Sequence, residues 1–184
     1  MRKAGVLVAI VLVVFIAAGT AMAVMDIFLK IDGIPGESTN DKHKDEIEVL
    51  SWSWGMTNAA TGAPGGGGGA GRVEFHDMAF TKYLDKATPK LFEAVASGEH
   101  LSKATLSFVQ AGKAEFTFFK MILSDILVTS FSQGASAGGA DLRPIEQISL
   151  SFGKVEMTYT TQNADGSPGG AVSAFWDIRA NKGF

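Results

Sequence analysis

The chain has no cysteine, and it has only three histidines in 184 residues. Without cysteine it has no disulfide, no thiolate nucleophile, no zinc–thiolate site and no cysteine for lipid attachment. The histidines are scattered, and none stands with a second histidine or a carboxylate cluster at metal-ligand spacing. The sequence therefore predicts no metal and no other cofactor. A domain of this length is expected to be held by an ordinary hydrophobic core.

The longest hydrophobic run lies within residues 1–23. A basic start precedes the apolar residues, and Ala21 and Ala23 form an A-x-A cleavage pattern in front of Val24. This arrangement predicts a cleaved signal peptide, which leaves one domain over residues 24–184.

Two other interpretations of this segment stay open. The apolar stretch over residues 4–25 is long enough to act as an uncleaved membrane anchor, with only Gly19 and Thr20 interrupting it. Translation from Met22 or Met25 would instead make the upstream stretch an artefact of the start site.

Basic charge is also scarce. The full chain has 16 basic and 19 acidic residues, and losing Arg2 and Lys3 with the signal peptide lowers the basic count to 14 and the net charge to −5. Binding to nucleic acid requires a basic surface that neutralises phosphates. The composition therefore predicts no nucleic-acid partner.

Most of the remaining sequence predicts short β-strands separated by glycine-rich or polar turns. The expected strands cover residues 26–31, 47–54, 72–75, 104–110, 115–123, 125–132, 145–152, 155–161 and 171–178. Residues 111–114 are expected to form a hairpin turn, and so is Gly153-Lys154. Eight or nine short strands with a single helix indicate a mainly β fold, a β-barrel or sandwich with one packed helix.

The predicted helix begins near Thr88 and ends at Gly98. Thr88 is a plausible N-cap, Pro89 fits the first helical position, and glycine commonly ends a helix. Its apolar stripe is expected to consist of Leu91, Phe92 and Val95.

An aromatic segment precedes the glycine-rich stretch. Trp52 and Trp54 have the same parity, so on a strand they lie on one face together with Leu50, while Ser51 and Ser53 lie on the other. The tryptophans can stack on a sugar or a base, but burial in the core is the favoured interpretation because aromatic side chains dominate core packing.

The stretch from Gly55 to Gly71 predicts a long loop, and such loops are usually functional. Its run of five glycines, 65–69, loses much backbone entropy when it is ordered, so a partner surface is expected to order it. A phosphate-binding interpretation fails, because the run ends in Gly71-Arg72 and enters a strand instead of ending in Gly-Lys-Ser/Thr before a helix.

Nothing in the pattern predicts an enzyme. The charged residues 37–46 are expected to form a solvated, internally balanced loop in which His43 is exposed. No serine lies in a Gly-x-Ser-x-Gly elbow.

Several segments together resemble the Hcp family, the tube proteins of type VI secretion systems. These segments are DIFLKIDGIPGES (26–38), DKHKDEIEVLSWSWGM (41–56), GGGGGAGRVEFHDMAFTKYLDKATPKLFEAVASGEH (65–100) and AFWDIRAN (174–181). The resemblance implies a two-sheet β-barrel with one helix against its side. It also implies six-membered rings that stack into a secreted tube. A contractile sheath propels such a tube, which carries a tip protein and effector proteins.

The resemblance further implies roles for individual residues. The glycine-rich loop is expected to reach an adjacent subunit or ring through Gly55, Met56, Pro64, Gly65, Gly66, Gly67, Gly68, Gly69 and Gly71. Ser51 and Ser53, opposite the tryptophans, are the candidates for the channel wall. The signal peptide departs from the family pattern, because the family's tube assembles from the cytoplasm. An exported ring that acts as a carrier outside the inner membrane is therefore the alternative.

Overall fold

A computed structural model describes residues 25–58, 73–110, 115–138 and 143–183. The predicted signal peptide, with Ala21, Ala23 and Val24, lies outside the described residues, and so do Pro64 and the glycines from Gly65 to Gly71. No helix in the described ranges is long and apolar enough to cross a membrane.

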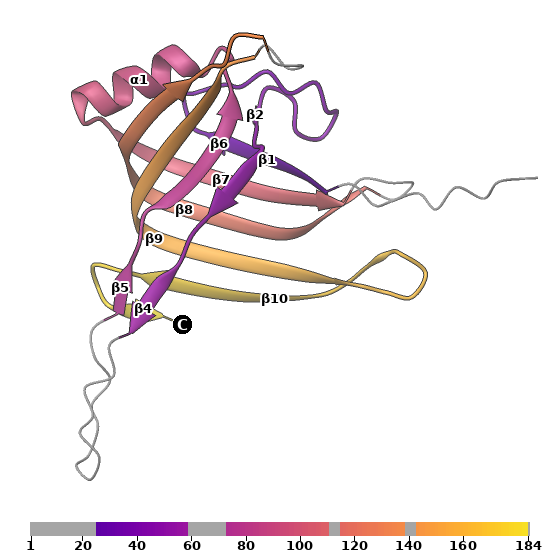
Figure 1. Ribbon diagram of the computed structural model, residues 1–184. Coiled ribbons are helices and arrows are strands. Elements are labelled where there is room, and N and C mark those ends of the chain that lie inside the picture. The colour runs from indigo at the N-terminus through magenta and orange to yellow at the C-terminus, as the bar shows by residue number, and fades with distance from the viewer. Residues whose placement is uncertain (1–24, 59–72, 111–114, 139–142, 184) are drawn as a thin grey trace, which may run out of the picture.

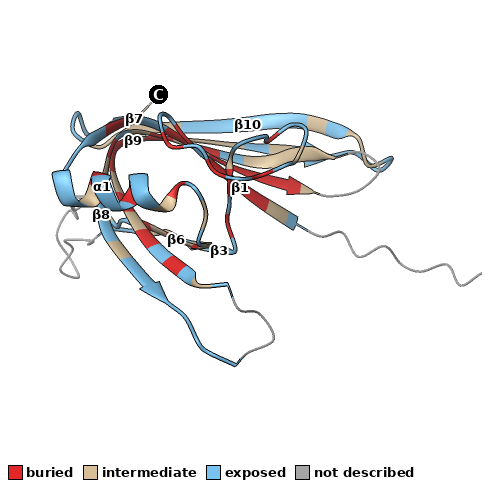
Figure 2. Ribbon diagram, turned by 90° about the horizontal axis from the view of Figure 1, so that it is seen from above, coloured by how far each residue is buried: buried red, intermediate tan, exposed pale blue. Residues whose placement is uncertain are grey.

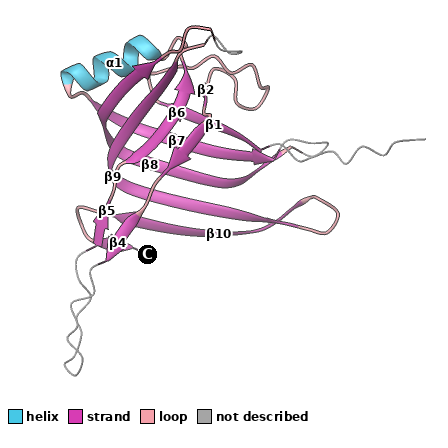
Figure 3. Ribbon diagram, viewed as in Figure 1, coloured by secondary structure: helices cyan, strands magenta, loops and turns pink. Residues whose placement is uncertain are grey.

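Within these ranges the chain forms eleven strands and one helix (Figure 3). The strands are β1 (Met25–Ile31), β2 (Ile47–Glu48), β3 (Ser51–Ser53), β4 (Met56–Asn58), β5 (Val73–Phe75), β6 (Met78–Tyr83), β7 (His100–Gln110), β8 (Phe116–Gly134), β9 (Ile145–Gln162), β10 (Pro168–Asp177) and β11 (Lys182–Gly183). The helix is α1 (Thr88–Ser97). The mainly β fold with one packed helix confirms the prediction, although strand β6 was not expected.

Nine strands form one sheet, and β4 with β5 forms a separate two-stranded ribbon (Figure 1). The main path runs β11–β10–β9–β8–β7–β1–β2, and β6 joins β9 to β3. The segment from β2 to β3 links the β2 end of this path to the β6–β3 branch, because Ile47 pairs with Leu29 of β1 whereas Trp52 pairs with Phe80 of β6. The sheet thus wraps around a single core.

Strands β8 and β9 are long, and both bend at the point where Asp125 lies opposite Gly153. Leu123 pairs with Val155 and Ile126 with Phe152, and all four side chains are buried. Residues three positions apart on a regular strand lie on opposite faces, so each strand buries a different face before and after the bend. Asp125 has a φ of 61°, and a Cβ on Gly153 would lie 2.9 Å from the Asp125 Cβ. Glycine is required here for close approach of the two strands.

The predicted turn at Gly153-Lys154 is therefore wrong. Strand β9 continues through it without a break, and the two strands expected over residues 115–123 and 125–132 are replaced by the single strand β8 (Phe116–Gly134). β8 lies along one edge of β9, whereas the other edge pairs with β6 in the first half and with β10 in the second. A glycine inside an otherwise apolar strand marks a bend in this fold.

The predicted strand over residues 47–54 is divided in two by Leu50. Ile47 and Val49 are buried on one side of this point, but Trp52 and Trp54 are the inward residues on the other. Leu50 is 44% exposed, so its predicted place beside the tryptophans is wrong. The change occurs because the backbone N–H of Val49 bonds to Ile27 of β1, whereas that of Leu50 bonds to Thr81 of β6. Both tryptophans are partly buried against the core.

Helix α1 packs against one edge of the core, near β8 (Figure 2). Its N-cap is Ala87 and not Thr88, which is the first helical residue, and Gly98 ends the helix in the left-handed conformation as expected. Leu91 is buried, but Phe92 is 60% exposed, so the predicted stripe is wrong at that position. The Phe92 ring instead contacts Phe131 of β8 edge to face, 6.1 Å between centroids.

The charged loop before β2 is docked on the sheet, so the prediction of a solvated loop is wrong at its centre. His43 is buried and stacks on Phe28 of β1, with 4.5 Å between the ring centroids. Its Nδ1 lies 2.8 Å from Glu46 Oε2. A Cβ on Gly36 would lie 2.3 Å from the Glu46 carbonyl oxygen, so the loop needs glycine where it folds back on itself.

A polar network is buried beneath the start of α1. Lys82 Nζ lies 2.6 Å from both Asp85 Oδ1 and Glu146 Oε2. The Thr88 hydroxyl donates to Glu146 Oε2 at 2.9 Å, and Gln133 Nε2 donates to Glu146 Oε1 at 2.6 Å. Each buried charge is thus paired and hydrogen-bonded, as burial requires. The network joins the helix start to β6, β8 and β9.

Candidate functional site

The outer face of the β3–β6–β9–β8 layer carries two rows of small and polar side chains. One row is Ser51, Thr81, Gln147 and Ser132, which are successive cross-strand partners. The next row is Ser53, Ala79, Ser149 and Ser130, paired in the same way. We call these eight residues the hydroxyl face.

The hydroxyl face lies back to back with a row of large apolar residues. Between its two rows run Trp52, Phe80, Ile148 and Phe131, also successive cross-strand partners. Since side chains alternate along a strand, burial of the apolar row directs both polar rows outward. The side chains of the face are exposed or half-buried. Ser51 and Ser53 therefore point away from the tryptophans, as their parity predicts.

The hydroxyl face offers hydrogen bonds but no acid–base chemistry. None of its eight side chains is charged or titrates near neutral pH. The Ser51 and Thr81 hydroxyls lie 2.7 Å apart and hydrogen-bond each other. Elsewhere in the described ranges, no three histidine or carboxylate side chains gather to hold a metal ion. The arrangement suits an uncharged, hydrated surface better than a catalytic centre.

Sequence reasoning identified two of the eight residues in this face. Ser51 and Ser53 stood out because tryptophans flank them. Gln147 and Ser149 had an equivalent signal, since they alternate with Glu146, Ile148 and Leu150 along β9. Glu146 concealed this alternation of inward and outward residues, because it is a buried carboxylate at a position where an apolar side chain is expected.

The β4–β5 ribbon carries the glycine-rich segment. Met56 pairs with Phe75 and Asn58 with Val73, so the expected loop is in fact a strand over Met56–Asn58. At its base, the Trp54 indole Nε1 donates to the His76 carbonyl oxygen at 3.0 Å, and the His76 N–H donates to the Gly55 carbonyl oxygen at 3.0 Å. The ribbon leaves the sheet near the ends of β10 and β11 (Figure 1).

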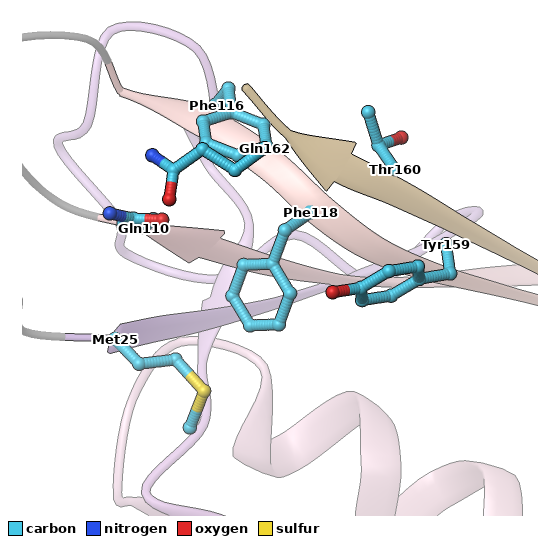
Figure 4. Close-up of a pocket in the computed structure, with 7 residues that line it drawn as sticks. All are labelled: Met25, Gln110, Phe116, Phe118, Tyr159, Thr160 and Gln162. Carbon is cyan, nitrogen blue, oxygen red and sulfur yellow. The ribbon is translucent and has the colours of Figure 1, made fainter. Parts of the chain in front are cut away.

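A shallow cavity of about 300 Å³ lies at the opposite end of the long strands. Met25 of β1, Phe118 of β8, and Tyr159 and Gln162 of β9 contribute to its wall. Figure 4 shows the Tyr159 side chain extending toward the Phe118 ring, with Gln162 farther along the strand. Its lining contains neither a charged group nor a histidine, and Tyr159 is its one titratable side chain.

The fold and sequence agree with one protein family. Residues 28–159 match the family model described as "Type VI secretion system effector, Hcp". The chain belongs to the Hcp family. It is 45% identical over 159 residues to the protein hcp1 of Pseudomonas aeruginosa, covering 85% of this chain and 97% of that one.

Solved structures of the Hcp family have the same architecture. A structure titled as a type six secretion system protein is 31% identical, with a TM-score of 0.83 over 88% of this chain and all of the other. Hcp1 from Salmonella typhimurium is 39% identical, with a TM-score of 0.74 over 89% of this chain and all of the other. The predicted family and fold are thereby confirmed.

Proposed function

We propose that this chain is a tube subunit that forms hexameric rings, that the rings stack into a type VI secretion tube, and that the hydroxyl face lines the channel. Membership of the Hcp family carries the proposal. The hydroxyl face supports it, because its eight side chains carry no charge and therefore neither repel nor trap cargo by a charge of their own. The tube leaves the cell with effector proteins, which meet Ser51 and Ser53 in the lumen.

The proposed ring contacts place the β4–β5 ribbon at a neighbouring subunit or ring. The segment between Asn58 and Val73 contains Pro64 and the run Gly65 to Gly69, which let one backbone approach another closely. Contacts between different patches of two subunits close a ring laterally and extend a stack axially. The sheath and the tip protein are the further partners of such a tube.

Single-cysteine labelling tests where the hydroxyl face lies, because the native chain has no cysteine. Spin labels at Ser53→Cys should give inter-subunit distances in the proportions of a hexagon's edge, short diagonal and long diagonal. Lys90→Cys on the exposed side of α1 is the matched control, since Lys90 is 61% exposed in its side chain. Shorter distances from position 53 than from position 90 support a channel wall. Equal or longer distances contradict it.

An exported carrier ring is the second candidate function, and the leader-like residues 1–23 favour it. Such a ring holds a partner outside the inner membrane without a contractile machine. Deleting residues 62–71 leaves a short connection between β4 and β5 and distinguishes the two functions. If the segment acts axially in a tube, stacking fails while single rings survive, whereas a carrier ring keeps its partner without stacking.

The N-terminal peptide decides which compartment the protein enters. Mass spectrometry on cell fractions should recover a peptide that begins at Val24 from periplasm or medium if the leader is cleaved. A cytoplasmic peptide that begins at Met22 or Met25 supports the ordinary tube subunit. Recovery of intact residues 1–23 in membranes identifies an anchor.

A further inference from the structure

A second cavity of about 210 Å³, partly open to solvent, lies between the β4–β5 ribbon and the β9–β10 part of the sheet. The ribbon contributes Met56, Val73 and Phe75 to its wall. Its remaining lining residues are Trp54, Val155, Met157, Ala174, Phe175 and Trp176. No lining side chain is charged, so the cavity selects a neutral occupant.

One polar group interrupts this apolar wall. Trp176 Nε1 is buried, and it has no hydrogen-bond partner. A Cβ on Gly183 of β11 would lie 2.7 Å from Trp176 Cε3, so the six-membered ring of the indole lies directly against Gly183. A buried donor without an acceptor is rare and unfavourable in folded proteins.

The size and the single donor together define the occupant. An apolar cavity of about 150 Å³ holds benzene, and pockets for drug-sized ligands begin at about 300 Å³. Aromatic walls such as Trp54 and Phe75, whose ring centroids are 6.3 Å apart, favour a flat ring system.

We propose that this cavity is a binding site for a small, neutral aromatic molecule of one or two rings that carries one hydrogen-bond acceptor for the Trp176 indole N–H. The occupant would touch Met56 on the ribbon and Ala174 on β10 at the same time. It would therefore join the ribbon to the sheet. The inference goes beyond the proposed tube function and does not depend on it.

Quinoline and naphthalene provide a matched pair of probes, because they share one shape and only quinoline has an acceptor nitrogen. We expect quinoline to bind about 2- to 10-fold more tightly in saturation-transfer NMR, the range given by one neutral hydrogen bond. We also expect it to shift the Trp176 indole N–H resonance, which Trp176→Phe assigns. Equal binding of the two probes, or an unmoved resonance at saturation, overturns the proposal.

Variants on one strand separate the cavity from the surrounding surface. Ala174→Leu adds a side chain at the cavity wall and should abolish quinoline binding. Ala171→Leu makes the same change on an exposed residue of β10 that does not line the cavity, and it should leave binding unchanged. If Ala174→Leu instead breaks the assembled particle apart and Ala171→Leu does not, a neighbouring subunit occupies the cavity and the ligand proposal fails. The particle mass measured without ligand reports the tube proposal separately.

Discussion

Lys82 Nζ lies 2.6 Å from Glu146 Oε2, and both side chains are fully buried. Neither partner is a usual occupant of a core position on a strand, and removing Lys82 leaves the buried Glu146 without a counter-charge. Desolvation makes an unpaired buried charge far more costly than an exposed one. The pair therefore holds the start of α1 against β6 and β9, because Thr88 of the helix hydrogen-bonds to the same Glu146 carboxylate.

Lys82→Met should lower the free energy of unfolding by about 3–5 kcal/mol, because Glu146 and Asp85 lose their counter-charge. Lys90→Met is the control, since the Lys90–Glu93 pair is exposed, is screened by solvent and should contribute little to stability. Lys82→Met combined with Glu146→Leu should be less destabilised than Lys82→Met alone. Denaturant unfolding measures all three, and equal losses for Lys82→Met and Lys90→Met would refute the role of the network.

Gly153→Ala should destabilise the fold by about 1–3 kcal/mol, because the new Cβ would lie 2.9 Å from the Asp125 Cβ at the bend of β8 and β9. Gly134→Ala on β8 is the control. It has open space around its Cα, and its effect should stay within about 0.5 kcal/mol. Combining Gly153→Ala with Asp125→Gly should restore most of the loss in thermal unfolding. No restoration in the double variant contradicts the steric explanation.

His43→Ala should cost about 1–3 kcal/mol, because it removes the ring stacked on Phe28 and leaves Glu46 without its partner. His76→Ala replaces an exposed histidine and should cost less than about 0.5 kcal/mol. Hydrogen exchange of residues 37–46 should rise only in His43→Ala. Equal exchange in both variants shows that His43 does not hold the loop.

The lowered pKa of Asp177 leads us to expect a loss of stability in acid. Its pKa lies below the ordinary value of 3.8, chiefly because the carboxylate accepts a hydrogen bond from the Ala180 N–H, with a smaller contribution from Lys154. A carboxylate whose folded-state pKa is lowered stabilises the fold above the unfolded-state pKa, and this contribution disappears as the pH falls through the folded-state pKa.

Asp177→Asn should therefore unfold more easily than the wild type at neutral pH, and the difference should shrink below pH 3.8. Lys154→Gln should keep most of this pH dependence, because the backbone hydrogen bond is the larger cause. Thermal melts across the acid range measure both variants. A difference between Asp177→Asn and wild type that does not change with pH contradicts this assignment.

The sequence predicted correctly those elements in which the local residue pattern matches the contacts made in the folded chain. Alternation and a short connection were enough for the antiparallel pairing of β7 with β8, and glycine was enough for the end of α1, which begins one residue earlier than predicted. Prediction failed where tertiary contacts override the local pattern. Leu50 changes sheets, Gly153 bends a strand instead of turning it, and Lys82 occupies a position that alternation reserves for an apolar side chain.

The candidate site was predictable in part for the same reason. Ser51 and Ser53 followed from strand parity beside two tryptophans. Ser130 and Ser132 were not recognisable, because the pairing of β8 with β9 shifts between Val128 and Ser130 and changes which residues face outward. Such an irregularity depends on the partner strand, which the local sequence does not contain.

The mass of the purified particle in solution tests the central claim most directly. Light scattering over a wide range of concentrations should give six subunits per particle, with longer stacks at high concentration. The wild type and Lys90→Met should behave alike, because the exposed pair on α1 has no part in the proposed ring. A strict monomer at the highest concentration would contradict the proposed ring and tube.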